Sequence, residues 1–189
     1  MADTIRTFIA VELSVEAKEE LCRVESELKK ADADIKWVDI ATMHLTVKFI
    51  GPTQEEGVPK ISRELELISS GREDIRLGLG GIGVFPKWDF PKVVWVGIDA
   101  GAAQLASLAK DADLAMSGLG FPEETRQFSP HITLGRVRGP RNKDKLKSIA
   151  ESVKVAHVVS NISKIVLFRS DLTPKGAIHT VLSEHEFHP

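Results

Sequence analysis

The same four-residue pattern occurs once in each half of this chain, and it constrains the fold more than any other feature. The two copies read His44-Leu45-Thr46-Val47 and His131-Ile132-Thr133-Leu134. Each lies in apolar, strand-like sequence, and side chains at positions i and i+2 of a strand project to the same side. The repeat therefore predicts two related strands that bring two imidazoles and two hydroxyls to one cleft.

Length and composition predict a soluble protein with a sizeable core. The chain has 189 residues, of which 42% are hydrophobic, and its net charge is −2, which fits one domain or two closely packed lobes. This charge argues against a protein that wraps long nucleic acid, but it leaves room for a local phosphate site. The single cysteine, Cys22, which is expected to pack within a helix, indicates a reducing, cytoplasmic setting. The sequence shows no signal-peptide character and no apolar run of the roughly 18 residues that span a membrane.

The order of predicted elements indicates an α+β fold. Helices are expected where apolar residues recur every three or four positions, in stretches around residues 17–28, 58–68, 105–116 and 146–153. Strands are expected over residues 7–13, 35–38, 44–50, 75–85, 93–98, 131–137, 158–168 and 177–184, with Gly51-Pro52 ending the first motif strand. We predict a single bilobal domain over residues 1–189. Its two pseudo-symmetric lobes would have mainly antiparallel strands, helices outside and a central cleft.

Strict alternation along the first motif strand divides its side chains between two faces. His44, Thr46 and Lys48 should share the polar face that looks into the cleft. The apolar residues between and after them, including Val47 and Phe49, should pack against helices.

Two histidines and two threonines on one face suit chemistry at a phosphodiester. One imidazole can take a proton from the nucleophile while the other gives a proton to the departing oxygen. The threonine hydroxyls, with a cation, can stabilise charge on the non-bridging oxygens. The pseudo-symmetry of the pair leaves open which histidine is the acid.

Paired histidines can also hold a metal ion or belong to a serine hydrolase. A catalytic metal needs three or four protein ligands, whereas neither motif contains a carboxylate or a thiol. A serine hydrolase of the common α/β type would show a Gly-x-Ser-x-Gly turn, which the sequence lacks. We therefore predict no catalytic metal at the two motifs. Two ordinary strand histidines, satisfied by neighbouring hydrogen bonds, are the remaining alternative.

Two further residues are candidates for substrate contacts. Arg136 could clamp a phosphate, but alternation puts it on the face opposite His131, so a bulge at Gly135 would be required; a surface arginine fits the sequence equally well. Phe8 could stack on a base, although a core position is more typical of phenylalanine. His179 sits in a late strand that could line the cleft. The histidines outside the motifs lack a threonine partner and are assigned no chemistry: His157, His179, His185 and His188.

Longer stretches around the motifs resemble the 2H phosphoesterase superfamily and, within it, the RNA 2′,3′-cyclic phosphodiesterases, also called 2′-5′ RNA ligases. Residues 43–51 and 128–136 resemble the two motif blocks of that family. Residues 6–13 resemble its opening strand, and residues 94–97 and 167–170 resemble further family segments. The likeness covers nearly the whole chain.

The resemblance implies a bilobal fold without a cofactor that hydrolyses an RNA-terminal or nucleoside 2′,3′-cyclic phosphate to a 2′-phosphomonoester. By the family pattern, His44 is the proton donor and His131 the proton acceptor. Thr46 and Thr133 would contact the phosphate, and Arg136 matches a phosphate-binding arginine. Family members often carry a tyrosine in the last strands, and this chain has no tyrosine, so His179 or a phenylalanine would take over the role of that ring. We expect a monomer that acts on an RNA end or a nucleotide, away from membranes.

Two other functions are compatible with these residues. The same site could join RNA ends, such as those of tRNA, through a 2′-5′ linkage by running the chemistry backwards. A module that binds a nucleotide or an RNA end without turnover is the alternative outside enzymes. The intact histidines of both motifs count against such a module.

Overall fold

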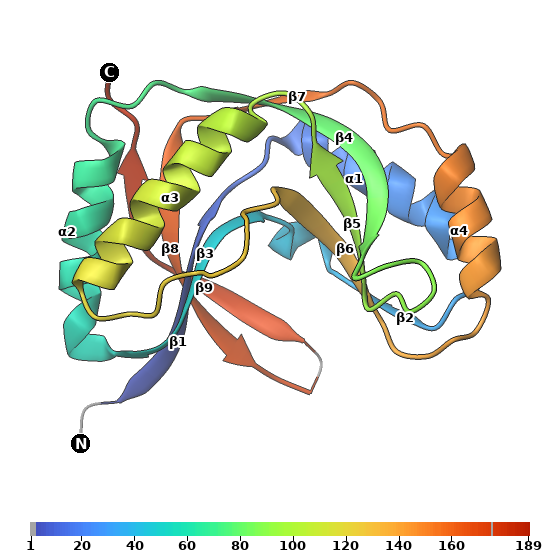
Figure 1. The fold of residues 1–189 in the computed structure, drawn as a ribbon, viewed down its shortest axis with the longest axis horizontal. Coiled ribbons are helices and arrows are strands. Elements are labelled where there is room, and N and C mark those ends of the chain that lie inside the picture. The colour runs from blue at the N-terminus through green and yellow to red at the C-terminus, as the bar shows by residue number, and fades with distance from the viewer. Residues whose placement is uncertain (1–2, 175) are drawn as a thin grey trace.

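The chain forms one curled β-sheet with helices packed against it (Figure 1). The computed structural model describes residues 3–174 and 176–189, and the elements below belong to those residues. The strands are β1 (Thr4–Val11), β2 (Ile35–Trp37), β3 (Leu45–Gln54), β4 (Ile75–Phe85), β5 (Val93–Ile98), β6 (His131–Val137), β7 (Val159–Ile162), β8 (Lys164–Leu172) and β9 (Ala177–Glu186). The α-helices are α1 (Val15–Lys29), α2 (Val58–Ser69), α3 (Ala102–Gly118) and α4 (Lys143–Ser152), and the short 3₁₀ turns are η1 (Ile40–Thr42) and η2 (Glu55–Gly57).

The sheet interleaves the two halves of the chain. Its strand order is β7-β4-β5-β6-β3-β1-β8-β9, with β2 added beside β6, and the paired strands are antiparallel. The group β7-β4-β5-β6 and the group β3-β1-β8-β9 each contain strands from both sequence halves. The predicted α+β class with mainly antiparallel strands is confirmed, but neither group of strands corresponds to one half of the sequence.

The sheet must curl, because two strands that are adjacent in sequence pair at distant places in it. β7 pairs with β4 and β8 pairs with β1, although only Ser163 separates them. The amide of Ser14, just after β1, donates to Ser160 Oγ in β7 over 2.8 Å, so the β7 edge lies near the end of β1. The prediction of one strand over residues 158–168 is wrong, because the chain changes partners at Ser163.

The helices follow the predicted apolar stripes and lie in two pairs. Figure 1 shows α2 beside α3 at one end of the molecule and α1 with α4 at the other. Ser14 caps α1 by accepting the Ala17 amide over 3.3 Å, and Leu21 and Leu28 are fully buried. Each such leucine contributes roughly 1.5–3 kcal/mol relative to an exposed one. Cys22, predicted to pack, is exposed instead, because the neighbouring residue occupies the buried stripe. No helix among the described residues is long and apolar enough to cross a membrane.

The first motif strand carries one extra residue directly after its threonine. Its pairing with β1 passes from Ala10–Thr46 to Ile9–Lys48 and leaves Val47 without a partner residue. A β-bulge of this kind moves the side chains that follow it to the opposite face. In β3 this applies to Lys48 and Phe49, because a second register shift leaves out Ile50.

The second motif strand has its extra residue at the same place. Its pairing with β5 passes from Trp95–Thr133 to Val94–Gly135 and leaves out Leu134. The duplicated motif therefore includes a duplicated bulge, which the sequence alone does not reveal for the first strand.

The bulge in β3 overturns the prediction that Lys48 lies beside the histidines. Lys48 is 7% exposed, because it has turned toward α3, where its ammonium pairs with Asp113 and donates to the Pro122 carbonyl over 3.0 Å. Phe49, predicted to pack under helices, is 70% exposed. The strand also continues past Gly51-Pro52 to Gln54, since β1 pairs with it that far.

Candidate active site

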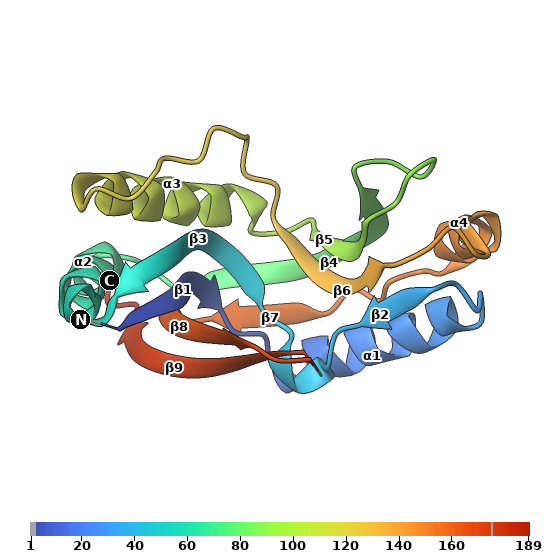
Figure 2. The ribbon, with the colours of Figure 1, turned by 90° about the horizontal axis from the view of Figure 1, so that it is seen from below.

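Strands β3 and β6 lie side by side and bring the two motifs together. Leu45 pairs with Ile132 in an antiparallel register. Extending that register by one residue each way makes His44 and His131 diagonal neighbours, with side chains on one face and backbones about 7–8 Å apart. Figure 2 shows β3 running from this region toward α2 and β6 toward α4. We call the side of the sheet that carries both histidines the histidine face.

Each threonine of the motifs lies across from the histidine of the other motif. Continued by one residue in each direction from Leu45 and Ile132, this register sets His44 opposite Thr133 and Thr46 opposite His131. Directly opposite side chains on neighbouring strands share a face and come within contact. The four groups therefore alternate as imidazole, hydroxyl, imidazole and hydroxyl around one point of the sheet.

Both imidazoles are held in the same orientation by their own backbone. The Nδ1–H of His44 donates to the Thr42 carbonyl over 2.8 Å, and that of His131 donates to the Ser129 carbonyl over 2.7 Å. These bonds select the neutral tautomer whose Nε2 is free to accept a proton. The Thr46 hydroxyl lies 3.1 Å from Nε2 of His44 and donates to it.

Burial makes both rings poor proton carriers in the free protein. Burial lowers the pKa of His44 to about 4, and the nearby His179 contributes to this decrease. The hydrogen bond to the Thr42 carbonyl acts in the opposite direction and raises the pKa. Burial also lowers the pKa of His131, against the opposing effect of the Ser129 carbonyl. Both imidazoles are thus neutral at pH 7 until an anion arrives, since a nearby negative charge favours the protonated form.

Aromatic rings pack around His44. The rings of Phe8 and Phe168 are stacked with centroids 5.1 Å apart, and that of Phe8 lies 4.9 Å from the ring of His44. These two phenylalanines belong to a small apolar cluster on the histidine face. Phe8 is only 3% exposed, so its contact with His44 is clear, and stacking of Phe8 on a base stays a prediction.

His179 of β9 belongs to this site, although no chemistry was assigned to it from the sequence. Its ring meets that of His44 edge-on at 5.3 Å and that of Phe8 at 4.9 Å. Its Nδ1 is buried without a hydrogen-bond partner among the described residues, and burial lowers its pKa. The only signal in the sequence was its place in a late strand, because its approach to His44 depends on the β8–β9 hairpin crossing toward β3.

Aromatic rings also flank His131. The rings of Phe85 and Trp95 lie 4.8 and 6.2 Å from it. Trp95 fits because residue 83 is glycine: a Cβ at Gly83 would stand 2.3 Å from the indole. Any larger residue at that position would displace the indole from its place beside His131.

Arg136 lies on the histidine face because of the bulge in β6. Leu134 is fully buried in the main core, and the exposed Arg136 follows on the other side. A phosphate contact by Arg136 requires a bulge, which was expected at Gly135. The bulge is present one residue earlier, at Leu134. The matching position in the first motif holds Phe49, so the two halves differ at this point.

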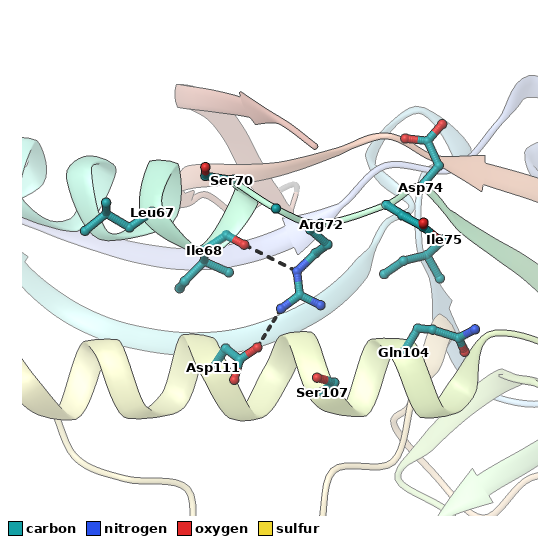
Figure 3. Close-up of a pocket in the computed structure, with 11 residues that line it drawn as sticks. Leu67, Ile68, Ser70, Arg72, Asp74, Ile75, Gln104, Ser107 and Asp111 are labelled. Carbon is teal, nitrogen blue, oxygen red and sulfur yellow. Dashed lines mark hydrogen bonds and ion pairs between the residues drawn. The ribbon is translucent and has the colours of Figure 1, made fainter. Parts of the chain in front are cut away.

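A cavity of about 660 Å³ lies elsewhere, between the turn after α2 and the helix α3 (Figure 3). Arg72 reaches across it and donates to Asp111 over 2.5 Å and to the Ile68 carbonyl over 3.4 Å. None of the motif residues lines this cavity. The guanidinium of Arg72 is already paired with the Asp111 carboxylate. We therefore do not assign the chemistry to this cavity, although it is large.

The groups available at the histidine face are imidazoles, hydroxyls and a guanidinium. The ring nitrogens of His44 and His131 meet the carbonyls of Thr42 and Ser129 and the Thr46 hydroxyl. Within residues 3–174 and 176–189, no group of three or more His, Cys, Asp or Glu side chains could hold a metal ion.

The sequence of this chain matches one known protein family twice in tandem. The family model described as LigT like Phosphoesterase matches residues 11–95 and again residues 96–179. The chain belongs to this family. Each match contains one His-x-Thr motif, so the internal repeat of this LigT-like phosphoesterase is a repeat of the family unit itself.

Curated relatives and solved structures agree with this assignment. The chain is 35% identical to the RNA 2′,3′-cyclic phosphodiesterase of Methanothermobacter thermautotrophicus over 93% of its own length and 95% of the relative. It is 34% identical to the protein of the same name from Methanocaldococcus jannaschii over 95% and 99%. A crystal structure from Thermus thermophilus aligns with a TM-score of 0.80 at 26% identity, covering 97% of this chain and 98% of the other.

Proposed function

We propose that this LigT-like phosphoesterase hydrolyses a 2′,3′-cyclic phosphate at an RNA end, or on a nucleotide, to a 2′-phosphomonoester. The observation that carries the proposal is the antiparallel register of Leu45 with Ile132, which sets the two imidazoles on one face. The activity for which the relatives from Methanothermobacter thermautotrophicus and Methanocaldococcus jannaschii are named supports the choice of substrate. Since both histidines come from one chain, we propose that a monomer suffices.

The reaction is one in-line displacement at phosphorus. A water oxygen forms a bond to phosphorus while Nε2 of His131 takes the water proton. The bond from phosphorus to the 3′ oxygen breaks, and His44 gives that oxygen its proton. The hydroxyls of Thr46 and Thr133 and the guanidinium of Arg136 donate to the non-bridging oxygens, where negative charge gathers. The assignment of acid and base follows the family pattern.

The low pKa of His44 adds a requirement to this mechanism. A ring with a pKa of about 4 holds almost no proton at pH 7, so the acid must gain its proton when the phosphate binds. The anionic phosphate supplies the cause, because an opposite charge within about 4–6 Å favours the protonated imidazole. Substrate binding and proton uptake are therefore coupled.

The pH dependence of kcat/KM should reveal this coupling. We expect a bell whose two limbs both lie below pH 6.5, because the pKa values of both rings are lowered in the free protein. In kcat, which reports the complex, the upper limb should move to higher pH. Rates on a nucleoside 2′,3′-cyclic phosphate from about pH 4 to about pH 9 measure both curves. A kcat/KM that stays level across this range would contradict catalysis by two histidines.

The decisive experiment is incubation with a defined oligonucleotide that ends in a 2′,3′-cyclic phosphate, with excess chelator present. We expect complete conversion to the 2′-phosphate isomer, because the reaction uses only side chains of this protein. Loss of turnover on chelation would contradict the metal-free mechanism. Tight binding of the oligonucleotide without turnover would instead favour a binding module.

A further inference from the structure

Two basic side chains without carboxylate partners lie beyond the histidines. Lys36 in β2 pairs directly with Arg136 in β6, so the two side chains leave their strands on the same side. Arg141 and Arg169, by contrast, each have a carboxylate partner. In the described part of the chain, no carboxylate lies within 4.0 Å of the charged groups of Lys36 or Arg136.

The neighbours of Lys36 in β2 fix the face on which it lies. A Cβ at Gly135 would meet Ile35 at 2.6 Å and Trp37 at 3.1 Å, and both of these residues pack on the main core. Because side chains alternate along a strand, Lys36 points to the opposite side. That side is the histidine face.

A contact with the β8–β9 hairpin gives the same placement. The ammonium of Lys36 lies 3.9 Å from the position that a Cβ on Gly176 would take. The same hairpin carries His179, whose ring contacts that of His44. Lys36 therefore lies on the side of the sheet where the imidazoles are, between β2 and the hairpin turn.

The placement of two like charges needs an explanation. Like charges directly opposite each other on neighbouring strands are destabilising. A bound anion removes this repulsion, and residues that reduce stability in the free protein are typical of functional sites. The ligand expected at such a pair is a phosphate, which arginine binds in a bidentate way and lysine as a point charge.

We propose that Lys36 binds a second phosphate of the substrate, next to the reacting phosphate that its strand neighbour Arg136 contacts. This phosphate lies on the 5′ side of the ribose whose cyclic phosphate meets the histidines. The inference rests on the proposed function, because it takes the bound RNA end as its reference point. It makes the substrate class an RNA end, or a nucleotide with a 5′-phosphate, in preference to a cyclic nucleoside phosphate alone.

Binding of three product-like ligands tests the proposal by calorimetry: adenosine 2′-phosphate, adenosine 2′,5′-bisphosphate and an ApA dinucleotide with a 2′-phosphate end. The wild-type protein should bind the last two more tightly. Lys36→Met should weaken the binding of these two ligands by about tenfold and leave the affinity for adenosine 2′-phosphate unchanged. It should also lower the slope of log affinity against log salt concentration for the dinucleotide by about 0.7. Lys36→Arg should retain the gain.

Lys60→Met is the matched control, because Lys60 is exposed on α2 and its replacement removes the same charge. If the wild-type protein binds both larger ligands more tightly than adenosine 2′-phosphate, the second phosphate is an internucleotide phosphate. If it binds only the bisphosphate more tightly, the second phosphate is the 5′-phosphate of a nucleotide. Both results support the phosphate site. Equal losses for all three ligands in Lys36→Met, or no loss at all, would overturn it. Binding requires no turnover, so failure of the proposed hydrolysis is a separate result.

Discussion

Replacement of His131 by alanine should lower kcat for a 2′,3′-cyclic phosphate by about 10²- to 10⁴-fold. The ring is the proposed proton acceptor, and alanine leaves no group that could take the proton of the attacking water. Thr133 and Arg136 would still hold the phosphate, so KM should change far less than kcat. Single-turnover rates on a cyclic-phosphate oligonucleotide measure the loss.

The His44→Ala variant gives the companion result. It should lose a comparable factor, and the double variant should be little worse than either single one, because the two rings act in one step. His188→Ala is the matched control, since His188 is exposed and outside the site. Near-normal turnover by either motif variant, with the fold intact, would remove the acid–base assignment.

Asp113→Ala should lower the free energy of unfolding by about 3 kcal/mol. The Lys48 side chain is 5% exposed and that of Asp113 is 23% exposed, so removal of the carboxylate leaves a buried ammonium with only the Pro122 carbonyl as acceptor. The same carboxylate also accepts the Glu124 amide over 3.0 Å. Urea unfolding monitored by circular dichroism measures the change.

A neighbouring acidic residue on the same helix provides the control for this prediction. Asp111 pairs with Arg72, but its side chain is 44% exposed, so Asp111→Ala should cost only about 0–1 kcal/mol. The double variant Lys48→Met, Asp113→Leu should recover much of the loss, because it replaces the ion pair with apolar contacts. Equal effects of the two aspartate variants would show that burial of Lys48 contributes nothing.

Local pattern predicted a large part of this fold. The strands at residues 75–85, 93–98 and 131–137 are where alternation and turn residues put them. Helix α1 begins after its Ser14 cap and buries the expected stripe. These features depend on neighbours within one element, and the sequence of that element contains the necessary information.

Features that depend on partner strands could not be predicted in the same way. The bulge at Val47 exists only as a mismatch with β1, and one extra residue was enough to send Lys48 to the core and Phe49 to the surface. The break at Ser163 is a change of partners, not of local propensity. His179 reached the site only through hairpin pairing.

The interleaving of the two halves has a consequence for how the molecule unfolds. Each group of strands contains hydrogen-bonded partners from both halves, so neither half could detach without leaving unpaired strand edges in the other. Pairings between residues far apart in sequence also slow folding, since long loops must close before the contacts form. We therefore expect the whole described chain to melt in one cooperative transition, with no stable half-molecule along the way.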